Sequence, residues 1–266
     1  MSSAVSPMDP RRPIAGDFLS LLASHELRPF RGEVAGSAPT ETQATTVLAF
    51  HFRDGVLVAG DRRATAGNVI VADSVDKVVD LDATSVLAVA GVPATAFEMA
   101  RVLQNSFEYY RRSQLQPLSL PAKVRSVGRL LKENLPMTLQ GVGVVVPLFV
   151  ALDPAMTPPA PRIYFYDPLG AQFQAAEFAA SGSGAGVVRS LMAFQTRFGS
   201  PKPSQMSLTE AVRFALRMLV TAAGMDSATG GVDPGAGRTA TLRWVGPEGV
   251  RTIGEELQRA GLSDAD

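Results

Sequence analysis

The sequence contains no cysteine and only two histidines, and these shortages exclude several classes of enzyme. Without cysteine the chain has no disulfide framework, no thiolate zinc site and no cysteine-protease nucleophile. A Ser-His-Asp triad or a multi-histidine metal site would have to use His25 or His51. His51 alternates with Phe50 and Phe52 on an expected strand, so we interpret it as a structural residue. A hydrolase built on this chain therefore needs a base other than histidine.

Long apolar runs and a surplus of one charge are also missing. No apolar stretch reaches the ~18 residues of a membrane-spanning helix, and Lys+Arg and Asp+Glu each total 25. The start of the chain lacks the basic segment followed by an apolar segment that is typical of a secretory signal. We therefore expect a cytoplasmic protein that binds neither nucleic acid nor membrane. The 46% hydrophobic content indicates a globular core.

Residues 1–44 differ from the rest of the chain. They carry prolines at positions 7, 10, 13, 29 and 39, with one helical pattern at residues 17–25 for which Asp17 is a suitable cap. From Thr46 onward, apolar strand patterns begin. We therefore predict a leader over residues 1–44 and a single domain over residues 45–266.

The domain shows blocks of strands separated by pairs of helices. Strands are predicted at residues 46–52, 56–59, 68–72, 77–80, 85–90, 144–152, 162–166, 239–245 and 250–253. The turn Arg53-Asp54-Gly55 joins the first two, and residues 68–72 and 77–80 are expected to pair. Helices are predicted at residues 94–111, 121–135, 187–198 and 207–223, the last with a capping box from Ser207 to Glu210. This order predicts an α+β fold of antiparallel sheets layered with helix pairs.

Thr45 stands where the leader meets the first strand. Inside a chain its hydroxyl is an ordinary polar group. If the bond between Ala44 and Thr45 is cut, Thr45 gains a free α-amine close to its own oxygen, and one residue then supplies nucleophile and base. Asp61, Lys77 and Gly91 follow at or near the ends of predicted strands. Taken alone, Asp61 beside two arginines fits an exposed ion cluster, and Lys77 fits a surface lysine.

In combination and order these motifs resemble the bacterial (actinobacterial-type) 20S proteasome β subunits, which are N-terminal nucleophile (Ntn) threonine hydrolases. The resemblance runs from Thr45 to about Gly254 and keeps the family's early spacing, with partners sixteen, thirty-two and forty-six residues after the threonine. Gly182-Ser183-Gly184 matches a supporting serine loop, and the stretch Asp226-Ser227-Ala228-Thr229-Gly230-Gly231 matches a late motif. The resemblance implies the catalytic set Thr45, Asp61, Lys77, Gly91, Ser183, Asp226 and Thr229.

The chemistry of these residue types fits the implied roles. A lysine ammonium beside Thr45 stabilises the developing alkoxide, and Asp61 would hold Lys77 charged and oriented. A free α-amine, with a reference pKa near ~8, suits proton transfer near neutrality through water. The backbone N–H of Gly91 is the implied oxyanion donor, and loss of one such donor slows catalysis ~10²–10³-fold.

Substrate preference follows from the resemblance alone. The family's substrate-binding positions fall on Ala64, Thr65, Val75, Val79, Val89 and Pro93. None carries a charge, so we expect cleavage after hydrophobic residues.

Ala44 departs from the family pattern, which has glycine before the catalytic threonine. Self-cleavage requires the Thr45 oxygen to attack the carbonyl of residue 44 in a strained turn that glycine enters freely and alanine only in part. Two outcomes stay open: slower removal of the leader, or a leader that stays on and leaves no α-amine. If the mature chain began at Thr46 instead, the spacing to Asp61, Lys77 and Gly91 would no longer match the spacing of the family.

The resemblance also implies a four-layer αββα sandwich, the Ntn-hydrolase fold. It implies a heptameric ring of β subunits, stacked with a second ring, capped by α subunits and served by a ring-shaped ATPase activator. Protein and peptide substrates would be cut inside the closed chamber, without a cofactor or metal. Two rival functions remain: a non-catalytic ring subunit that keeps its leader, and a six-membered bacterial threonine protease of the same fold. The long leader and the stretch 226–231 favour the proteasome type.

Overall fold

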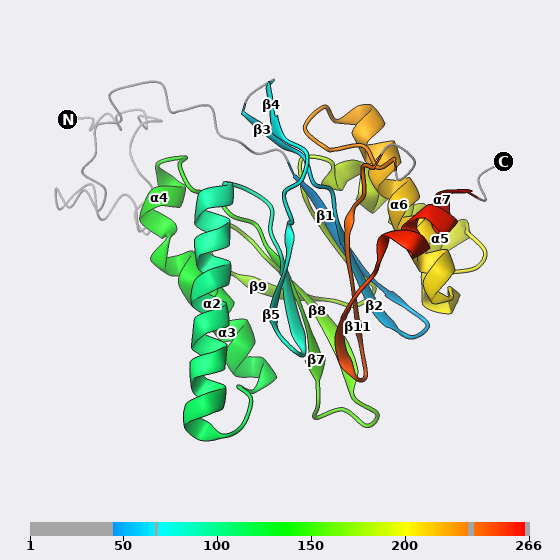
Figure 1. Ribbon diagram of the computed structural model, residues 1–266. Coiled ribbons are helices and arrows are strands. Elements are labelled where there is room, and N and C mark those ends of the chain that lie inside the picture. Colours follow the sequence, from blue (N-terminus) through cyan, green and yellow to red (C-terminus); the bar gives the residue numbers. More distant parts are fainter. Residues whose placement is uncertain (1–44, 67–68, 234–236, 264–266) are drawn as a thin grey trace, which may run out of the picture. The chain divides into compact units, whose positions relative to one another are not determined.

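The computed structural model describes residues 45–66, 69–233 and 237–263, which form a four-layer sandwich (Figure 1). Two antiparallel sheets lie face to face, and a pair of helices covers the outer face of each. The expectation of an α+β fold with an αββα order of layers is confirmed. The predicted helix at residues 17–25 lies outside the described residues.

The first sheet contains the strand that follows Thr45. Its strands are β1 (Thr46–Phe52), β2 (Gly55–Gly60), β10 (Phe178–Gly182), β11 (Thr241–Gly246) and β12 (Gly249–Thr252), in the order β10–β1–β2–β11–β12. The accompanying helices are α5 (Ala185–Phe198), α6 (Leu208–Met225), α7 (Glu255–Ser263) and the 3₁₀ helix η1 (Pro203–Gln205). The predicted capping box is confirmed, because Glu210 N–H donates to Ser207 Oγ and Ser207 N–H donates to the Glu210 carboxylate.

The second sheet supports the other helical layer. Its strands are β5 (Val78–Asp82), β6 (Ser85–Ala88), β7 (Leu148–Asp153), β8 (Ala160–Tyr166) and β9 (Gln172–Ala175), paired in chain order. The helices on this side are α2 (Pro93–Gln114), α3 (Leu120–Glu133) and the short α4 (Leu135–Leu139). The strand predicted from residue 144 begins only at Leu148, directly after Pro147, because proline has no N–H to give to a strand ladder.

The core has three parts because every sheet face is covered. Along β1, Leu48 and Phe50 pack against α5 and α6, while Val47 and Ala49 pack between the two sheets. Successive side chains of a strand point to opposite faces, so burial on both faces requires apolar residues at consecutive positions. A third cluster joins the second sheet to α2 and α3. This double burial holds the start of β1 rigidly, and Thr45 precedes it directly.

The expected pairing of residues 68–72 with residues 77–80 is wrong. A separate hairpin is formed by β3 (Ala64–Ala66) and β4 (Val69–Ala72), and β5 pairs with β6. The β5–β6 turn is closed by Asp82, whose Oδ1 accepts from the N–H of Thr84 and from the hydroxyls of Thr84 and Ser85. Such local closure favours the nearest partner strand. The β3–β4 hairpin projects from the sandwich (Figure 1), with all three apolar side chains from Val69 to Val71 exposed.

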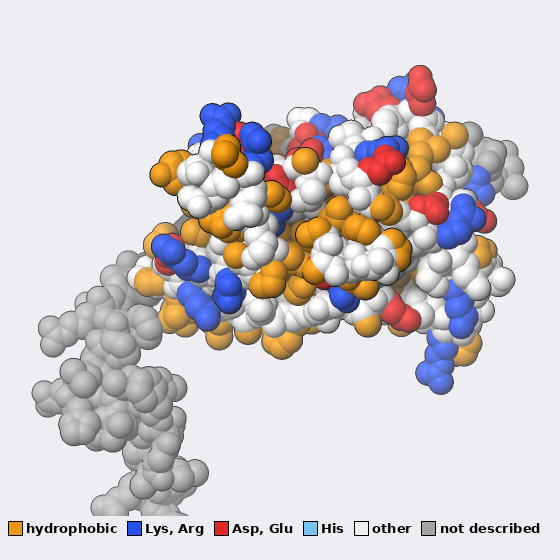
Figure 2. Space-filling model, turned by 90° about the horizontal axis from the view of Figure 1, so that it is seen from below, with side chains coloured by type: hydrophobic (Ala, Val, Ile, Leu, Met, Phe, Trp, Pro, Cys, Tyr) orange, Lys and Arg blue, Asp and Glu red, His pale blue; other side chains and the backbone are white. Residues whose placement is uncertain are grey.

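The surface mixes charge and apolar side chains. On the face drawn in Figure 2, hydrophobic side chains lie between groups of Lys and Arg and groups of Asp and Glu. Within the described segments, no helix combines the length and apolar character that crossing a membrane requires.

Candidate active site

Asp61 and Lys77 form a buried ion pair at the end of β2. Lys77 Nζ lies 2.7 Å from Asp61 Oδ1, and the two side chains are 4% and 0% exposed. The Asp61 carboxylate also accepts three backbone N–H groups: Thr46 to Oδ1 at 2.8 Å, and Arg63 and Gly230 to Oδ2 at 3.0 and 2.8 Å. The alternative interpretation of Asp61 and Lys77 as exposed surface charges is therefore wrong.

Burial lowers the pKa of Lys77, because leaving water penalises the ammonium form. The carboxylate of Asp61 acts in the opposite direction, and the nearby charge of Arg63 adds to the lowering. The net direction is downward from the ordinary value of 10.5. A lysine with a lowered pKa exchanges its proton more readily near neutral pH than a surface lysine does.

The peptide unit that joins Thr45 to Thr46 is held at both ends. The Thr45 carbonyl oxygen accepts from the backbone N–H of Ser183 at 2.9 Å and lies 3.3 Å from Ser183 Oγ. The Thr46 N–H donates to Asp61 Oδ1 at 2.8 Å. Val47 faces the space between the sheets, so the strand alternation places Thr45 on that side and Thr46 toward the helices. Thr45 itself is 3% exposed.

Asp226, Thr229 and Ser183 form a second polar cluster behind this peptide unit. Asp226 caps the C-terminal end of α6, and its Oδ2 accepts from Ser183 Oγ at 2.6 Å and from Thr229 Oγ1 at 2.5 Å. The pKa of Asp226 lies below its ordinary value. Burial alone would raise this pKa, but it is outweighed by the hydrogen bonds from Ser183, Thr229 and the Ala228 N–H and by the charge of Lys77. Asp226 is therefore held as a carboxylate, ready to accept hydrogen bonds.

Thr46 connects the two clusters, and the sequence analysis did not include its side chain among the site residues. Its N–H bonds to Asp61, while its Oγ1 lies 2.6 Å from Thr229 Oγ1 and accepts from the Gly184 N–H at 3.1 Å. The signal was present in the sequence: alternation places the residue after Thr45 on the opposite face of β1, and a threonine there can bond to the late motif.

Gly91 has a backbone conformation that no side chain would fit. Its φ is +119°, and a Cβ built on it would lie 2.1 Å from the Val144 carbonyl oxygen. The Val92 N–H donates to Val144 O and the Val146 N–H donates to Ala90 O, at 2.9 and 2.8 Å. Such bonds on either side of Gly91 mark a non-hydrogen-bonded position of an antiparallel pair. The N–H of Gly91 therefore points away from this neighbouring segment.

A pocket of about 300 Å³ adjoins both Gly91 and Ser183. Its lining residues are Ala90, Gly91, Val144, Val146, Ser181, Gly182, Ser183 and Arg189. Two of the seven predicted catalytic positions thus line one pocket beside the start of β1.

The six predicted substrate-binding positions lie on or beside β3, β5 and β6 and at the start of α2. Thr65 and Ala64 are on β3, and the Val75 N–H donates to the carbonyl of Arg62. The Val89 N–H donates to the Lys77 carbonyl, which places Val89 beside the ion pair. Val89 is only 4% exposed and belongs to the cluster under α2 and α3, against which Val79 also packs. Pro93 begins α2.

Ala44, on the leader side of the predicted cut, lies outside the described residues. Within the segments that the structure describes, no group of three or more His, Asp or Glu side chains is arranged to hold a metal ion.

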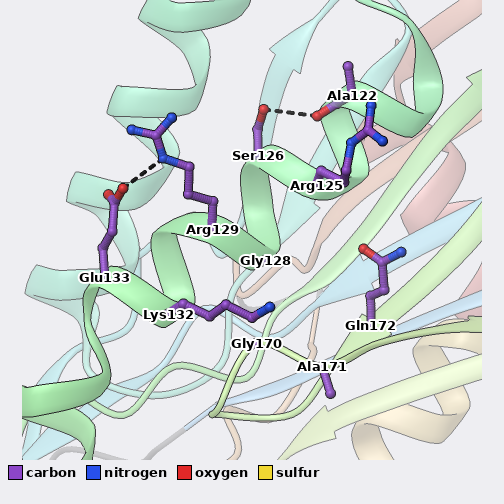
Figure 3. A pocket seen from close by; sticks show the side chains of 10 residues that line it. All are labelled: Ala122, Arg125, Ser126, Gly128, Arg129, Lys132, Glu133, Gly170, Ala171 and Gln172. Carbon is purple, nitrogen blue, oxygen red and sulfur yellow. Dashed lines mark hydrogen bonds and ion pairs between the residues drawn. The ribbon is translucent and has the colours of Figure 1, made fainter.

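A second pocket lies apart from these clusters. It has a volume of about 840 Å³ and opens between α3 and the turn before β9 (Figure 3). Three basic side chains line it: Arg125, Arg129 and Lys132. Arg129 pairs with Glu133 at 2.7 Å. None of the predicted site residues is among its described lining residues, so this pocket is separate from the candidate site.

Comparison with known proteins places the chain in a family. A family model described as "Proteasome subunit" matches residues 41–233. A protein named proteasome subunit beta from Acidimicrobium ferrooxidans is 33% identical over 251 residues, covering 94% of this chain and 89% of its own length. The chain belongs to the proteasome subunit family. Two further relatives are also named proteasome subunit beta. The protein from Frankia alni is 35% identical, and the match covers 90% of this chain and 84% of the relative. The protein from Acidothermus cellulolyticus is 38% identical, and the match covers 82% of this chain and 73% of the relative.

The resemblance stated from the motifs is thus confirmed, and the chain is a β-type proteasome subunit. The αββα sandwich is the Ntn-hydrolase fold of this family. The family model matches residues 41–233 of this chain, a range that contains the seven predicted catalytic positions from Thr45 to Thr229 and the bond between Ala44 and Thr45.

Proposed function

We propose that this chain is a threonine endopeptidase subunit of a 20S proteasome core, with Thr45 as nucleophile after residues 1–44 are removed. The observation that carries the proposal is the buried contact between Lys77 Nζ and Asp61 Oδ1 at 2.7 Å. The same Asp61 oxygen accepts the N–H of Thr46, the residue after the nucleophile. A buried lysine costs free energy unless it is paired, so a lysine that shares this carboxylate with the residue after Thr45 favours a chemical role.

Peptide cleavage would proceed by acyl transfer. Thr45 Oγ1 attacks the substrate carbonyl carbon, and its proton passes to the Thr45 α-amine through water. The positive charge of Lys77 stabilises the alkoxide as it forms, and the Gly91 N–H donates to the oxyanion of the tetrahedral intermediate. The intermediate collapses to an ester on Thr45, and the leaving amine takes the proton. Water then attacks the ester, which releases the second peptide and restores the threonine.

Removal of the leader would use the same atoms on the chain's own backbone. Thr45 Oγ1 attacks the carbonyl carbon of Ala44, and the acyl group moves from nitrogen to oxygen. Water hydrolyses the resulting ester, which frees residues 1–44 and leaves the α-amine on Thr45. In this first reaction the Thr45 nitrogen is an amide and cannot accept a proton, so we assign that task to Lys77, whose pKa is lowered by burial.

Preference for cleavage after hydrophobic residues is part of the proposal. Of the six positions Ala64, Thr65, Val75, Val79, Val89 and Pro93, five are apolar and none is charged. A charged residue before the scissile bond would lose water there without gaining an opposite charge.

Assembly into a heptameric β ring, with α subunits and a ring-shaped ATPase activator, completes the proposal. Contiguous apolar side chains on a protein surface mark sites of protein–protein contact. Phe194 and Phe198 on α5 are 62% and 68% exposed and their ring centroids lie 5.5 Å apart, which supports contact with another subunit there. Other large apolar side chains exposed among the described residues are Tyr109, Leu115 and Met225.

The test is the N-terminus of the assembled particle. The chain is produced together with a proteasome α subunit, particles are isolated, and the β chain is weighed by mass spectrometry. We expect a chain of residues 45–266 and hydrolysis of a fluorogenic peptide with a hydrophobic residue before the cut. Thr45→Ala should assemble, keep its leader and show no hydrolysis. Assembled rings of the wild type that retain residues 1–44 would support the non-catalytic rival instead.

A further inference from the structure

Thr46 sits on a closed ring of polar contacts that starts and ends on one peptide unit. The Thr45 carbonyl is bound by Ser183, Ser183 Oγ is bound by Asp226, and Asp226 is bound by Thr229. Thr229 Oγ1 lies 2.6 Å from Thr46 Oγ1, and Thr46 is covalently bonded to Thr45. Both threonine side chains in the ring, Thr46 and Thr229, are 0% exposed.

The direction of each hydrogen bond in this ring follows from the donors available. A carboxylate only accepts, so Thr229 uses its single hydroxyl hydrogen toward Asp226 Oδ2 at 2.5 Å. The hydrogen between Thr229 and Thr46 must then come from Thr46. The Thr46 oxygen in turn accepts the Gly184 N–H at 3.1 Å. The relay therefore runs from Gly184 N–H through Thr46 and Thr229 to Asp226.

The space around the relay admits no side chain at position 184. A Cβ built at Gly184 would lie 2.4 Å from Thr46 Oγ1 and 2.8 Å from Thr229 Oγ1. Gly184 directly precedes α5, so its N–H and the two hydroxyls lock the start of β1 against the helical layer. Replacing the Thr46 hydroxyl with a methyl group would leave the Gly184 N–H buried without this acceptor, which is costly in a dry site.

We propose that Thr46 is a positioning residue for the nucleophile. Its hydroxyl closes this ring and thereby fixes Thr45 between Ser183 and Lys77. Thr46 does not face the substrate side of β1, so it acts only through its neighbours. The inference rests on the proposed function, since it assigns Thr46 a role in that same reaction. Misplacement of a reacting group by about 1 Å can cost on the order of 10²-fold in rate.

The experiment compares Thr46→Val with Thr46→Ser in particles assembled with the α subunit. Thr46→Val keeps the shape and removes the hydroxyl, and Thr46→Ser restores the hydroxyl. Ser85→Ala is the matched control, because Ser85 is equally buried and bonds to Asp82 in the other sheet. The readouts are kcat and KM for a hydrophobic fluorogenic peptide, each per mature chain counted by mass spectrometry, and the pH profile of kcat.

For Thr46→Val we expect kcat to fall about 10- to 100-fold with KM changed less than about threefold, and the pH profile to shift. Thr46→Ser should recover to within about threefold of wild type, and Ser85→Ala should match wild type. Wild-type kcat and pH profile in Thr46→Val, or a serine variant as slow as the valine variant, would overturn the inference. If Thr46→Val does not assemble, Thr229→Val breaks the same bond from the other end, and a wild-type kcat there also overturns it.

Failure of the proposed function gives a different result. In that case the wild type lacks hydrolysis, or Thr45→Ala retains it. Failure of the inference alone gives an active wild type, an inactive Thr45→Ala and an unimpaired Thr46→Val.

Discussion

Lys77 Nζ lies 2.7 Å from Asp61 Oδ1 in a place where both side chains are almost fully removed from water. The two residues adjoin different sheets, because Asp61 follows β2 and Lys77 precedes β5. The pair therefore joins the two sheets at the edge where Thr45 stands. Three backbone N–H groups share the carboxylate, so Asp61 keeps partners even when the lysine is lost.

Lys77→Ala should therefore separate activity from folding. We expect at least about 10³-fold less hydrolysis and little leader removal, because the nucleophile loses its positive neighbour. The free energy of unfolding should fall by less than the roughly 3–5 kcal/mol typical of a broken buried pair, because the three N–H donors remain. Peptide hydrolysis and urea unfolding measure the two effects. Lys132→Ala, at the distant basic pocket, is the control, and full hydrolysis by Lys77→Ala would refute the assignment.

Gly91→Ala should damage both the backbone and the proposed oxyanion contact. The positive φ costs alanine about 1–3 kcal/mol, and its Cβ would meet the Val144 carbonyl at 2.1 Å. We expect kcat to fall about 10²–10³-fold because the N–H at residue 91 moves.

The control for Gly91→Ala is a glycine with open space around it. Gly186 lies in α5, and a Cβ there meets nothing within 4 Å. Gly186→Ala should be neutral or raise the free energy of unfolding by about 0.5–1 kcal/mol, with kcat unchanged. Equal losses in both variants would show that the effect is not specific to position 91.

Ala44→Gly should speed removal of the leader. Glycine reaches backbone conformations closed to alanine, so the carbonyl at position 44 can approach Thr45 Oγ1 with less strain. The time course of residues 45–266 appearing in mass spectra measures this, with hydrolysis per mature chain expected to stay unchanged. An unaltered time course would mean that another step limits maturation.

His51 should make stability depend on pH between neutral and mildly acid conditions. Burial lowers the pKa of His51 from 6.5, and the charge of Arg162 lowers it further. Below about pH 6.5 the unfolded chain binds a proton at this position more readily than the folded chain does, so the free energy of unfolding falls as pH drops toward the folded pKa. Thermal unfolding at about pH 7.5 and 5.5 should show this loss, and His51→Gln should reduce it. If the wild type and His51→Gln lost the same stability between the two pH values, a group other than His51 would be responsible.

The candidate site was predicted from the order and spacing of motifs that resemble the family, and not from the residue types alone. Taken singly, Asp61 and Lys77 fitted exposed surface charges, because nothing in the local sequence shows that β2 and β5, in different sheets, bring them together. The fold class followed from the order of the strand and helix patterns. The capping box at Ser207 was predictable because it depends on residues only three apart.

Other features depend on contacts that local sequence does not encode. The pairing of β3 with β4 was mispredicted because strand propensity does not specify a partner. β10 was not predicted because Phe178–Gly182 consists mostly of small residues and resembles a turn. For Thr46, strand alternation predicts the face of β1 on which its side chain lies, but its partner Thr229 is 183 residues away and is brought to it only by the folded chain.

The Thr45–Thr46 peptide unit, held by Ser183 on its oxygen and by Asp61 on its nitrogen, bears on what happens at a newly cut end. The first residues of most chains fray, because nothing offsets the roughly 1–2 kcal/mol of backbone entropy that each ordered residue loses. A cut before Thr45 would create a terminus whose first peptide plane is already fixed. Cleavage would then free an amine without freeing the residue that carries it, and the entropy of ordering the nucleophile would be lost during folding rather than in each catalytic cycle.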